Sequence, residues 1–249
     1  MEKAYKFRIY PNKTQEVLIQ KTFGCTRFVY NHYLAKRIDL YQKENQTLSY
    51  GSCSADMTKL KKELDWLKEV DSTALQSSLK DLDIAYQNFF RRLKQGNQKA
   101  GFPKFKSKRN NHKSYKTKMN IRLDEKTIQL PKLGKIKCKV SRQIEGRIIS
   151  ATVSQTPSGK YFVSLICTEV YPQQLEQSGE LIGLDLGLKE FAILSNGEKF
   201  DNPKYLAKST KKLAKLQRQL SRKQNGSNNR NKARIKVARI HEKNYKSTI

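Results

Sequence analysis

The sequence predicts an α+β protein with more than one domain. Apolar residues recur with the period of a strand at the N-terminus, with helical spacing over most of the next 90 residues, and again with the strand period from about residue 119 to 167. A short strand with a single central acid, followed by a hairpin signal and two basic helices, completes the chain. Because 249 residues can form one large domain or two ordinary ones, a second domain is expected after the strand-rich region.

The N-terminal segment predicts one strand and then a helical region. Residues 4–10 alternate apolar and basic side chains, and Pro11 ends the expected strand. Helical spacing then runs from a cap at Thr14 to about Asn45, and Gly24 predicts a break into two helices at an angle. This pair could be a helix-turn-helix, although any two helices around a glycine give the same pattern. A short helix is expected from about Asp56.

The clearest helix predicted from the sequence lies between residues 71 and 96. A cap among residues 71–73 starts it and Gly96 ends it. Its apolar residues repeat at spacings of three and four: Leu75, Leu79, Leu82, Tyr86, Phe89 and Leu93. This stripe predicts a core contact rather than a binding site.

Residues 94–118 are basic and rich in Gly, Asn and Ser. Within them, aromatic and basic side chains alternate at Phe102, Lys104, Phe105, Lys106 and Lys108. This pattern suits a strip that follows a nucleic-acid backbone and stacks on its bases. A solvated linker whose two Phe rings dock on the core fits the pattern equally well.

The period of two between residues 119 and 167 predicts about five short strands, separated by turn signals such as Pro131 and Gly146. Closely spaced short strands indicate a small antiparallel barrel. The strand over residues 4–10 could join this barrel, and the helical region would then be an insertion between its strands.

Charge points to a polyanionic partner. The chain carries 51 Lys and Arg against 22 Asp and Glu, which gives a net charge of +29 and a pI near 10.0. Nucleic acid fits this charge best, because neutralising phosphates releases counterions. A ribosomal-type or membrane-surface role fits the charge alone equally well.

The sequence contains no apolar run of about 18 residues and no apolar stretch at its start, so we expect a soluble, cytoplasmic protein without a membrane partner. The four cysteines lie far apart and form no Cys-x-x-Cys pair: Cys25, Cys53, Cys138 and Cys167. Buried reduced thiols and no zinc site are therefore expected.

One segment has the pattern of a catalytic strand. Residues 181–188 predict a buried strand with one acid, Asp185, and Asn196-Gly197 predicts a hairpin turn. RNase H-like nuclease folds begin in this way, and their first-strand Asp helps to hold two divalent ions. A buried Asp paired with a Lys or Arg is an equally good interpretation, because Gly-x-Asp-x-Gly is short and common.

The final stretch, residues 204–239, has no acidic residue. Two helices with apolar stripes are expected there, on either side of a loop at residues 226–229. Their cations could hold RNA or a heteroduplex backbone: Lys211, Lys215, Arg218, Arg222, Lys223, Arg230 and Arg234. A solvated surface is the alternative, although so one-sided a charge repels itself without a polyanion.

Eight short blocks occur in a fixed order along the chain: KFRIYP at 6–11, RFVYN at 27–31, ALQ at 74–76, GFPKF at 101–105, GLDLG at 183–187, NPKY at 202–205, LSRK at 220–223 and ARIH at 238–241. Together they resemble the TnpB family, also called OrfB transposases, which is similar in architecture to type V CRISPR effectors. The blocks cover essentially the whole chain and are more specific together than any one of them.

This resemblance implies a wedge β-barrel with an inserted helical recognition domain, followed by the start of a RuvC nuclease domain of RNase H-like fold. The implied boundaries are residues 1–12 for the first wedge strand, 13–111 for the recognition domain, 112–175 for the remaining wedge strands and 178–249 for the partial RuvC domain with a basic helical arm. Family members bind a guide RNA made from the transposon end, read a short motif beside a double-stranded DNA target, and cut DNA with three carboxylates and Mg²⁺.

By the same resemblance, Asp185 corresponds to the first of the three carboxylates, and Tyr50, Thr73 and Gln76 stand where family members contact the target-adjacent motif. The second acid, a four-cysteine zinc ribbon and the third acid lie in the family beyond the two helices that end this sequence. The resemblance therefore implies guided binding of RNA and DNA with an incomplete Mg²⁺ site, no zinc and no cleavage by this polypeptide alone. A nuclease-dead guided repressor and a helix-turn-helix DNA-binding transposition factor remain the alternatives.

Overall fold

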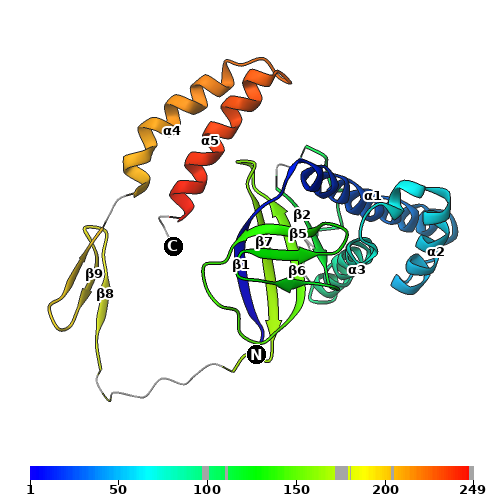
Figure 1. The fold of residues 1–249 in the computed structure, drawn as a ribbon, viewed down its shortest axis with the longest axis horizontal. Coiled ribbons are helices and arrows are strands. Elements are labelled where there is room, and N and C mark those ends of the chain that lie inside the picture. The colour runs from blue at the N-terminus through cyan, green and yellow to red at the C-terminus, as the bar shows by residue number, and fades with distance from the viewer. Residues whose placement is uncertain (97–100, 110–111, 172–178, 180, 203–204, 247–249) are drawn as a thin grey trace. The chain divides into compact units, whose positions relative to one another are not determined.

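The computed structural model describes the whole chain except residues 97–100, 110–111, 172–178, 180, 203–204 and 247–249 (Figure 1). Two of the expected domain boundaries, at residue 111 and at 175–178, lie outside this description.

The chain forms two compact units, the first made of residues 1–156 and 160–171 and the second of residues 157–159 and 172–249. The elements of the first unit are β1 (Lys3–Tyr10), α1 (Lys13–Glu44), α2 (Tyr50–Glu63), the 3₁₀ helix η1 (Asp65–Lys68), α3 (Ser72–Lys94), β2 (Lys113–Thr117), β3 (Arg122–Leu123), β4 (Thr127–Leu130), β5 (Gly134–Lys139), β6 (Arg147–Gln155) and β7 (Tyr161–Thr168).

The first unit contains a seven-stranded antiparallel sheet with the strand order β2-β6-β7-β1-β5-β4-β3. Strand β1 lies in its middle, between β7 and β5, with Phe7 opposite Val163 and Tyr5 opposite Leu165. Since successive side chains of a strand point to opposite faces, Tyr5, Phe7 and Ile9 all enter the core. The expectation that the first strand joins the later ones, with the helices inserted between them, is confirmed.

The sheet is open, which corrects the expectation of a closed barrel. Its edge strands are β2 and β3, and within the described residues no ladder joins them. Strand β3 has only two residues, so it offers little edge for pairing. The other edge strand, β2, ends in Thr117, whose hydroxyl donates to the side chain of Asp71 beside α3. The helical insertion therefore lies where β2 would have to meet a closing strand.

Strand β2 lies in the basic Gly- and Asn-rich segment, where the apolar period predicts no strand, although the family resemblance implies strands from residue 112. Its residues Tyr115 and Thr117 are buried two positions apart, while Ser114 is exposed. The strand period was therefore present over residues 113–117. The surrounding lysines obscured it.

Helix α1 runs without a break from Lys13 to Glu44, which corrects the expected bend at Gly24. A glycine inside a helix costs about 1 kcal/mol relative to alanine, and packing of a helix face can offset this. Here Phe23 and Cys25 are buried on either side of it. The cap is Asn12, with a reciprocal capping box to Gln15, and not the expected Thr14.

Helices α1, α2 and α3 enclose a second apolar core beside the sheet (Figure 1). Helix α3 begins at a cap formed by Asp71 and extends to Lys94, as its apolar stripe predicted. Helix α2 begins at Tyr50, earlier than expected, with Ser49 as its cap. The buried residues of this core include Val29, Tyr33, Leu34, Leu67, Leu75, Leu79 and Leu82.

The second unit contains a three-stranded antiparallel sheet, β8 (Leu184–Leu186), β9 (Glu190–Leu194) and β10 (Lys199–Asp201), and two helices, α4 (Tyr205–Ser221) and α5 (Asn228–Lys246). The strand around Asp185 is exposed rather than buried, which corrects the expectation from its apolar neighbours. Leu184 is 58% and Leu186 65% exposed. Three short strands form a single layer, whose side chains stay exposed unless another element packs on them, and Ala192 of β9 is buried.

Two expectations that depend on composition can be compared with the structure. In the described part of the chain, no helix is long and apolar enough to cross a membrane. All four cysteines are buried free thiols, as expected. Burial raises the pKa of the Cys138 thiol to about 11, so this thiol stays protonated at neutral pH.

Candidate nucleic-acid interface

The start of α3 is held by one buried carboxylate. Asp71 is 9% exposed, and its side chain accepts hydrogen bonds from the backbone N–H groups of Thr73 and Ala74, both at 3.1 Å. It also accepts from the Thr73 hydroxyl and, at 2.6 Å, from the hydroxyl of Thr117 at the end of β2. This network fixes the first turn of α3 against the edge of the sheet. Thr73, one of the residues expected to read DNA, therefore has its hydroxyl engaged within the chain.

The other two residues expected to read DNA are Tyr50 in α2 and Gln76 in α3. Tyr50 begins α2, and the Lys80 ammonium lies over its ring, 5.0 Å from the centroid. Gln76 and Lys80 are both exposed and four residues apart, so they share one face of α3. Lys80 thus contacts Tyr50 and shares a face of α3 with Gln76, and its ammonium also pairs with the Asp83 carboxylate at 3.0 Å.

The segment that carries Lys104, Lys106 and Lys108 is docked on the helices. The side chain of Asn31 in α1 makes two hydrogen bonds with the backbone of Lys106. The Asn31 amide nitrogen donates to the Lys106 carbonyl at 3.0 Å, and the Lys106 N–H donates to the Asn31 side-chain oxygen at 2.8 Å. Phe102 makes edge contacts with the rings of Tyr86 and Phe89 at the far part of α3. The expected docking of this segment is therefore found for the Phe102 ring, which packs on α3.

The same segment still presents its other side chains to solvent. Lys104, Lys108 and Phe105 are exposed, and the Phe105 ring is 56% accessible. Lys106 is held in place: its ammonium lies 4.1 Å from the centroid of Tyr30 and 3.9 Å from the Asp81 carboxylate. Partial burial lowers the pKa of Lys106, and Asp81 opposes this lowering. The docked backbone thus holds a cationic, aromatic surface in one conformation.

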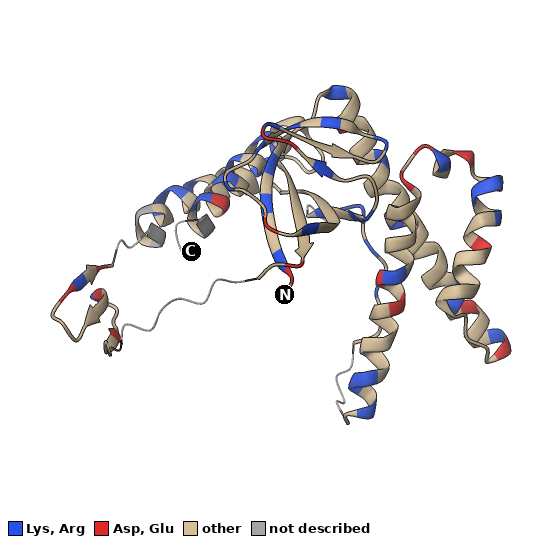
Figure 2. Cartoon of the chain, turned by 60° about the horizontal axis from the view of Figure 1, so that its bottom comes forward, with Lys and Arg blue, Asp and Glu red and all other residues tan. Residues whose placement is uncertain are grey.

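In the second unit, α4 carries four exposed cations on a single face. Lys211, Lys215 and Arg218 lie on the helix, and Arg222 follows its last residue. At about 100° per residue, the three cations on the helix fall within an arc of about 60°, and Arg222 lies just beyond the end of the helix. Leu213, Leu216 and Leu220 lie on the opposite side and are partly buried. We call the four cations the α4 basic face, and Figure 2 shows the α4–α5 pair almost free of acidic residues.

Arg230 differs from the other cations predicted to bind RNA. Its guanidinium donates to the backbone carbonyls of Leu220 at 3.2 Å and Lys223 at 3.0 Å. These are carbonyls at the C-terminal end of α4, which a helix leaves without partners of its own. Arg230 therefore closes the turn between α4 and α5. Lys223 is exposed at the same turn, and Arg234 lies one turn further along α5 and is partly buried.

Asp185 lies in the middle of β8, opposite Ile193 of β9, and is exposed. No ion pair to it occurs among the described residues, so the paired interpretation receives no support there. In the same residues, no three His, Cys, Asp or Glu side chains come close enough to hold a metal ion. One carboxylate is an appropriate ligand for Mg²⁺ but cannot supply the two-metal geometry of nucleases, so the described residues do not form a complete magnesium site.

We expect Asp185→Asn to change the free energy of unfolding by less than about 0.5 kcal/mol, because an exposed residue without partners contributes little to stability. Urea unfolding of the variant and the parent chain would measure this. A loss of more than about 1 kcal/mol would mean that Asp185 has a structural partner.

The sequence analysis missed three residues that organise this interface. Asp71 had been considered only as a helix cap, and its bond to Thr117 joins residues that are 46 positions apart. Asn31 contacts a backbone 75 positions away, and no pattern in the sequence indicates that contact. Lys80 is exposed on α3 and contacts Tyr50 of α2. Its spacing of four from Gln76 was the available signal.

These features define a class: a strongly basic α+β protein with exposed cationic and aromatic surfaces and an isolated Asp on a short hairpin, the properties of a nucleic-acid-binding protein. Comparison with known proteins agrees. Residues 1–46 match an OrfB family described as "Helix-turn-helix domain", and residues 165–247 match an OrfB family described as "Probable transposase". The first match covers β1 and the continuous α1.

Three relatives extend the comparison. "Putative RNA-guided DNA endonuclease InsQ" of Escherichia coli is 38% identical over 96% of this chain and 58% of the relative. "Putative RNA-guided DNA endonuclease" of Streptomyces pristinaespiralis is 36% identical over 97% of this chain and 60% of the relative. "Virulence protein VsdF" of Salmonella dublin is 33% identical over 43% of this chain and 95% of the relative.

The chain belongs to the OrfB family of transposon-associated proteins, which the sequence blocks had indicated. It spans somewhat less than two thirds of the length of the two endonuclease relatives.

Proposed function

We propose that this chain binds a guide RNA and a double-stranded DNA target, as the nucleic-acid-binding part of an RNA-guided system. The observation that carries the proposal is the α4 basic face, where four exposed cations align on one side of a helix whose other side is apolar. Such an array repels itself in solution and is stabilised by a polyanion. The names of the two endonuclease relatives support RNA as that polyanion.

The family architecture gives the parts of this proposal. The seven-stranded sheet would be the wedge domain, with α1–α3 as the recognition insertion from residue 13 to 111 and strands resuming from residue 112. Strands β8–β10 would be the start of a RuvC-like domain from residue 178, with α4 and α5 as its basic arm. On this assignment Tyr50 and Gln76 face the target-adjacent motif, together with Lys80, and Thr73 supports them through Asp71.

DNA cleavage is not part of the proposal for this polypeptide by itself. Asp185 would supply one ligand to Mg²⁺, and the described residues do not bring three His, Cys, Asp or Glu side chains together into a metal site. Hydrolysis of DNA by the purified chain in Mg²⁺, abolished by Asp185→Ala, would overturn this part of the proposal.

The proposed function is tested by purifying the chain with RNA transcribed from the transposon end and with an unrelated RNA of equal length. We expect a complex with the transposon RNA that survives about 150 mM salt and binds a matching DNA duplex carrying the adjacent motif. RNase treatment should then abolish specific DNA binding. If specific DNA binding is unchanged after RNase, the protein is a helix-turn-helix DNA-binding factor. If RNA is not bound at all, the proposal is wrong.

A further inference from the structure

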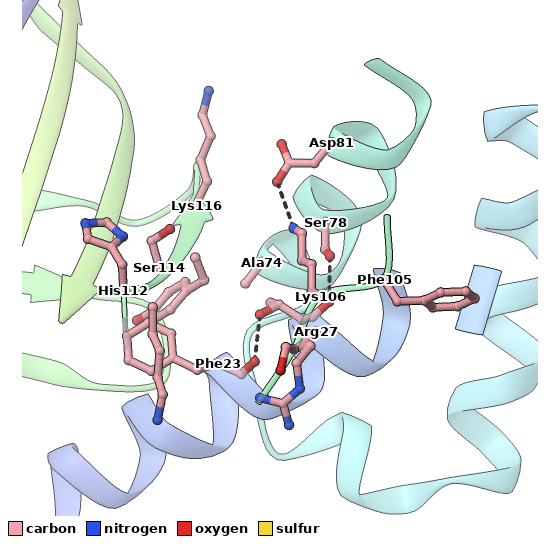
Figure 3. Close-up of a pocket in the computed structure, with 14 residues that line it drawn as sticks. Phe23, Arg27, Ala74, Ser78, Asp81, Phe105, Lys106, His112, Ser114 and Lys116 are labelled. Carbon is pink, nitrogen blue, oxygen red and sulfur yellow. Dashed lines mark hydrogen bonds and ion pairs between the residues drawn. The ribbon is translucent and has the colours of Figure 1, made fainter. Parts of the chain in front are cut away.

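A pocket of about 490 Å³ lies in the first unit, between β2, α3, α1 and the docked segment at residues 105–107 (Figure 3). Its deepest lining is apolar. Phe23, Ala74 and Tyr115 are buried there, and the rings of Phe23 and Tyr115 meet edge to face with their centroids 5.7 Å apart. Most of the other lining residues are polar or charged, so a ligand of this pocket needs polar groups as well as an apolar face. The volume is within the usual range for such sites.

The rim of this pocket is cationic with one exception. Arg27, Lys106, Lys113 and Lys116 contribute basic side chains from three parts of the chain. Asp81 of α3 is the only acid in the lining. Figure 3 shows Asp81 and Lys106 on the side of the docked segment, and His112, Ser114 and Lys116 on the side of β2.

The Asp81 carboxylate is only loosely paired. Its ion pair with Lys106 is 3.9 Å long, too long for a hydrogen bond, and Lys106 also lies over the ring of Tyr30. Among the described residues no hydrogen bond to this carboxylate is present. The Asp81 side chain is 55% exposed, so it is open to a ligand from solvent. Its partial burial raises the pKa of the carboxyl, and Lys106 and Lys116 oppose the increase. The carboxylate therefore has acceptor capacity that a ligand with N–H groups could use.

A ligand of this pocket has to satisfy both charges. An anion alone would meet the cations but would be repelled by Asp81, and a cation would be repelled by the rest of the rim. A nucleotide meets both requirements, since its phosphate pairs with Lys or Arg and its base offers N–H donors to the Asp81 carboxylate. Aromatic and apolar lining suits the base plane.

The hydrogen-bonding edge of each base indicates which base fits the Asp81 carboxylate best. A carboxylate has two acceptor oxygens side by side and binds best to two adjacent donors. Guanine presents two adjacent donors, N1–H and the N2 amino group, on its Watson–Crick edge. Adenine, cytosine and uracil each place an acceptor next to their donor, and this acceptor would face one carboxylate oxygen.

We propose that the pocket binds an unpaired guanine nucleotide of RNA, with Asp81 accepting from the base edge and the basic side chains of the rim, Arg27, Lys113 and Lys116, attracting the phosphate. The proposal rests on the proposed function in one respect, namely that RNA supplies the nucleotide. Binding of a nucleotide to the pocket can be measured without any guide RNA.

The test is equilibrium binding of the four ribonucleoside monophosphates to the intact chain. We expect the guanine nucleotide to bind at least about tenfold more tightly than the other three, since a bidentate pair gives discrimination of this size. Asp81→Asn should abolish this preference, because the amide presents one donor and one acceptor. Asp65→Asn is the matched control, since Asp65 lies outside the pocket and its side chain is 82% exposed. It should change nothing, and unfolding curves would show that both variants are folded.

A second set of measurements separates the possible sources of the nucleotide. A single-stranded RNA oligomer with one guanine should bind more tightly than the mononucleotide, and pairing that guanine in a duplex should remove the preference. Lys113→Gln with Lys116→Gln should weaken all four mononucleotides equally. Equal affinities for the four bases would show a phosphate site and overturn the proposal, as would absence of any mononucleotide binding. If the transposon RNA is still bound in either case, the proposed function remains and only the guanine pocket is wrong.

Discussion

Replacing Lys211, Lys215, Arg218 and Arg222 together by glutamine lowers the affinity of the chain for RNA on the order of 100-fold at about 150 mM salt. Each phosphate that a single strand neutralises adds about 0.7 to the slope of log K against log salt. If each of the four exposed cations contacts one phosphate, their loss reduces that slope by about 3 and leaves a smaller affinity at every salt concentration. Glutamine keeps helix propensity close to that of Lys and Arg, so α4 should still form.

The measurement is a salt titration of RNA binding by the parent chain and the variant. The matched control exchanges the cations among themselves, with Lys211→Arg, Lys215→Arg, Arg218→Lys and Arg222→Lys, which conserves the charge of the α4 basic face. That control should retain the slope. If the glutamine variant keeps both slope and affinity, the face is a solvated surface and RNA binds elsewhere.

The elements that the sequence predicted best are those whose own pattern determines them. Strand β1 follows from the alternation at Tyr5, Phe7 and Ile9, and α3 follows from its stripe and from a cap at Asp71. In both, local propensity and burial favour the same structure. The break at Gly24 was wrong because packing around Phe23 and Cys25 outweighs a single unfavourable residue.

The features that could not be predicted depend on contacts between distant segments. Closure of the sheet would have required β2 and β3 to pair, and the apolar pattern of each strand is the same in an open sheet as in a barrel. The apolar neighbours of Asp185 indicated a buried strand, but burial depends on a covering layer, which lies in other parts of a chain. The pocket around Asp81 likewise depends on β2, a strand hidden among lysines.

The candidate site was predictable in its charges and not in its geometry. The cations of α4 were identified from composition, and the structure aligns four of them while it assigns Arg230 to the carbonyls at the end of α4. Tyr50 and Gln76 were predicted from the family resemblance, and the structure adds Lys80, whose ammonium lies over the Tyr50 ring. Sequence spacing gives the face of a helix, whereas it does not show which polar side chain is already bonded within the chain.

The second large effect is expected at Asp71, where one carboxylate serves two elements. Asp71→Ala should lower the free energy of unfolding by about 3 kcal/mol. Loss of a helix cap costs about 1 kcal/mol, and loss of a buried charged acceptor that leaves Thr117 with fewer partners costs about 2 kcal/mol more. Thr117 is 1% exposed, so water does not replace the lost bond. Urea unfolding followed by circular dichroism measures the change.

A double-mutant cycle separates the cap from the bond to the sheet. Thr117→Val removes the hydrogen bonds of this hydroxyl to Asp71 and Thr73 and leaves the cap itself in place, so the loss in the double variant should be smaller than the sum of the two single losses by about 1 kcal/mol. Asp71→Asn keeps a good cap and should recover part of the stability, whereas Asp65→Ala, an exposed Asp in η1, should stay within about 0.5 kcal/mol of the parent. Strict additivity would show that α3 and the sheet are stabilised independently. Coupling would show that the start of α3, which carries Thr73 and Gln76, takes its position from the edge of the sheet.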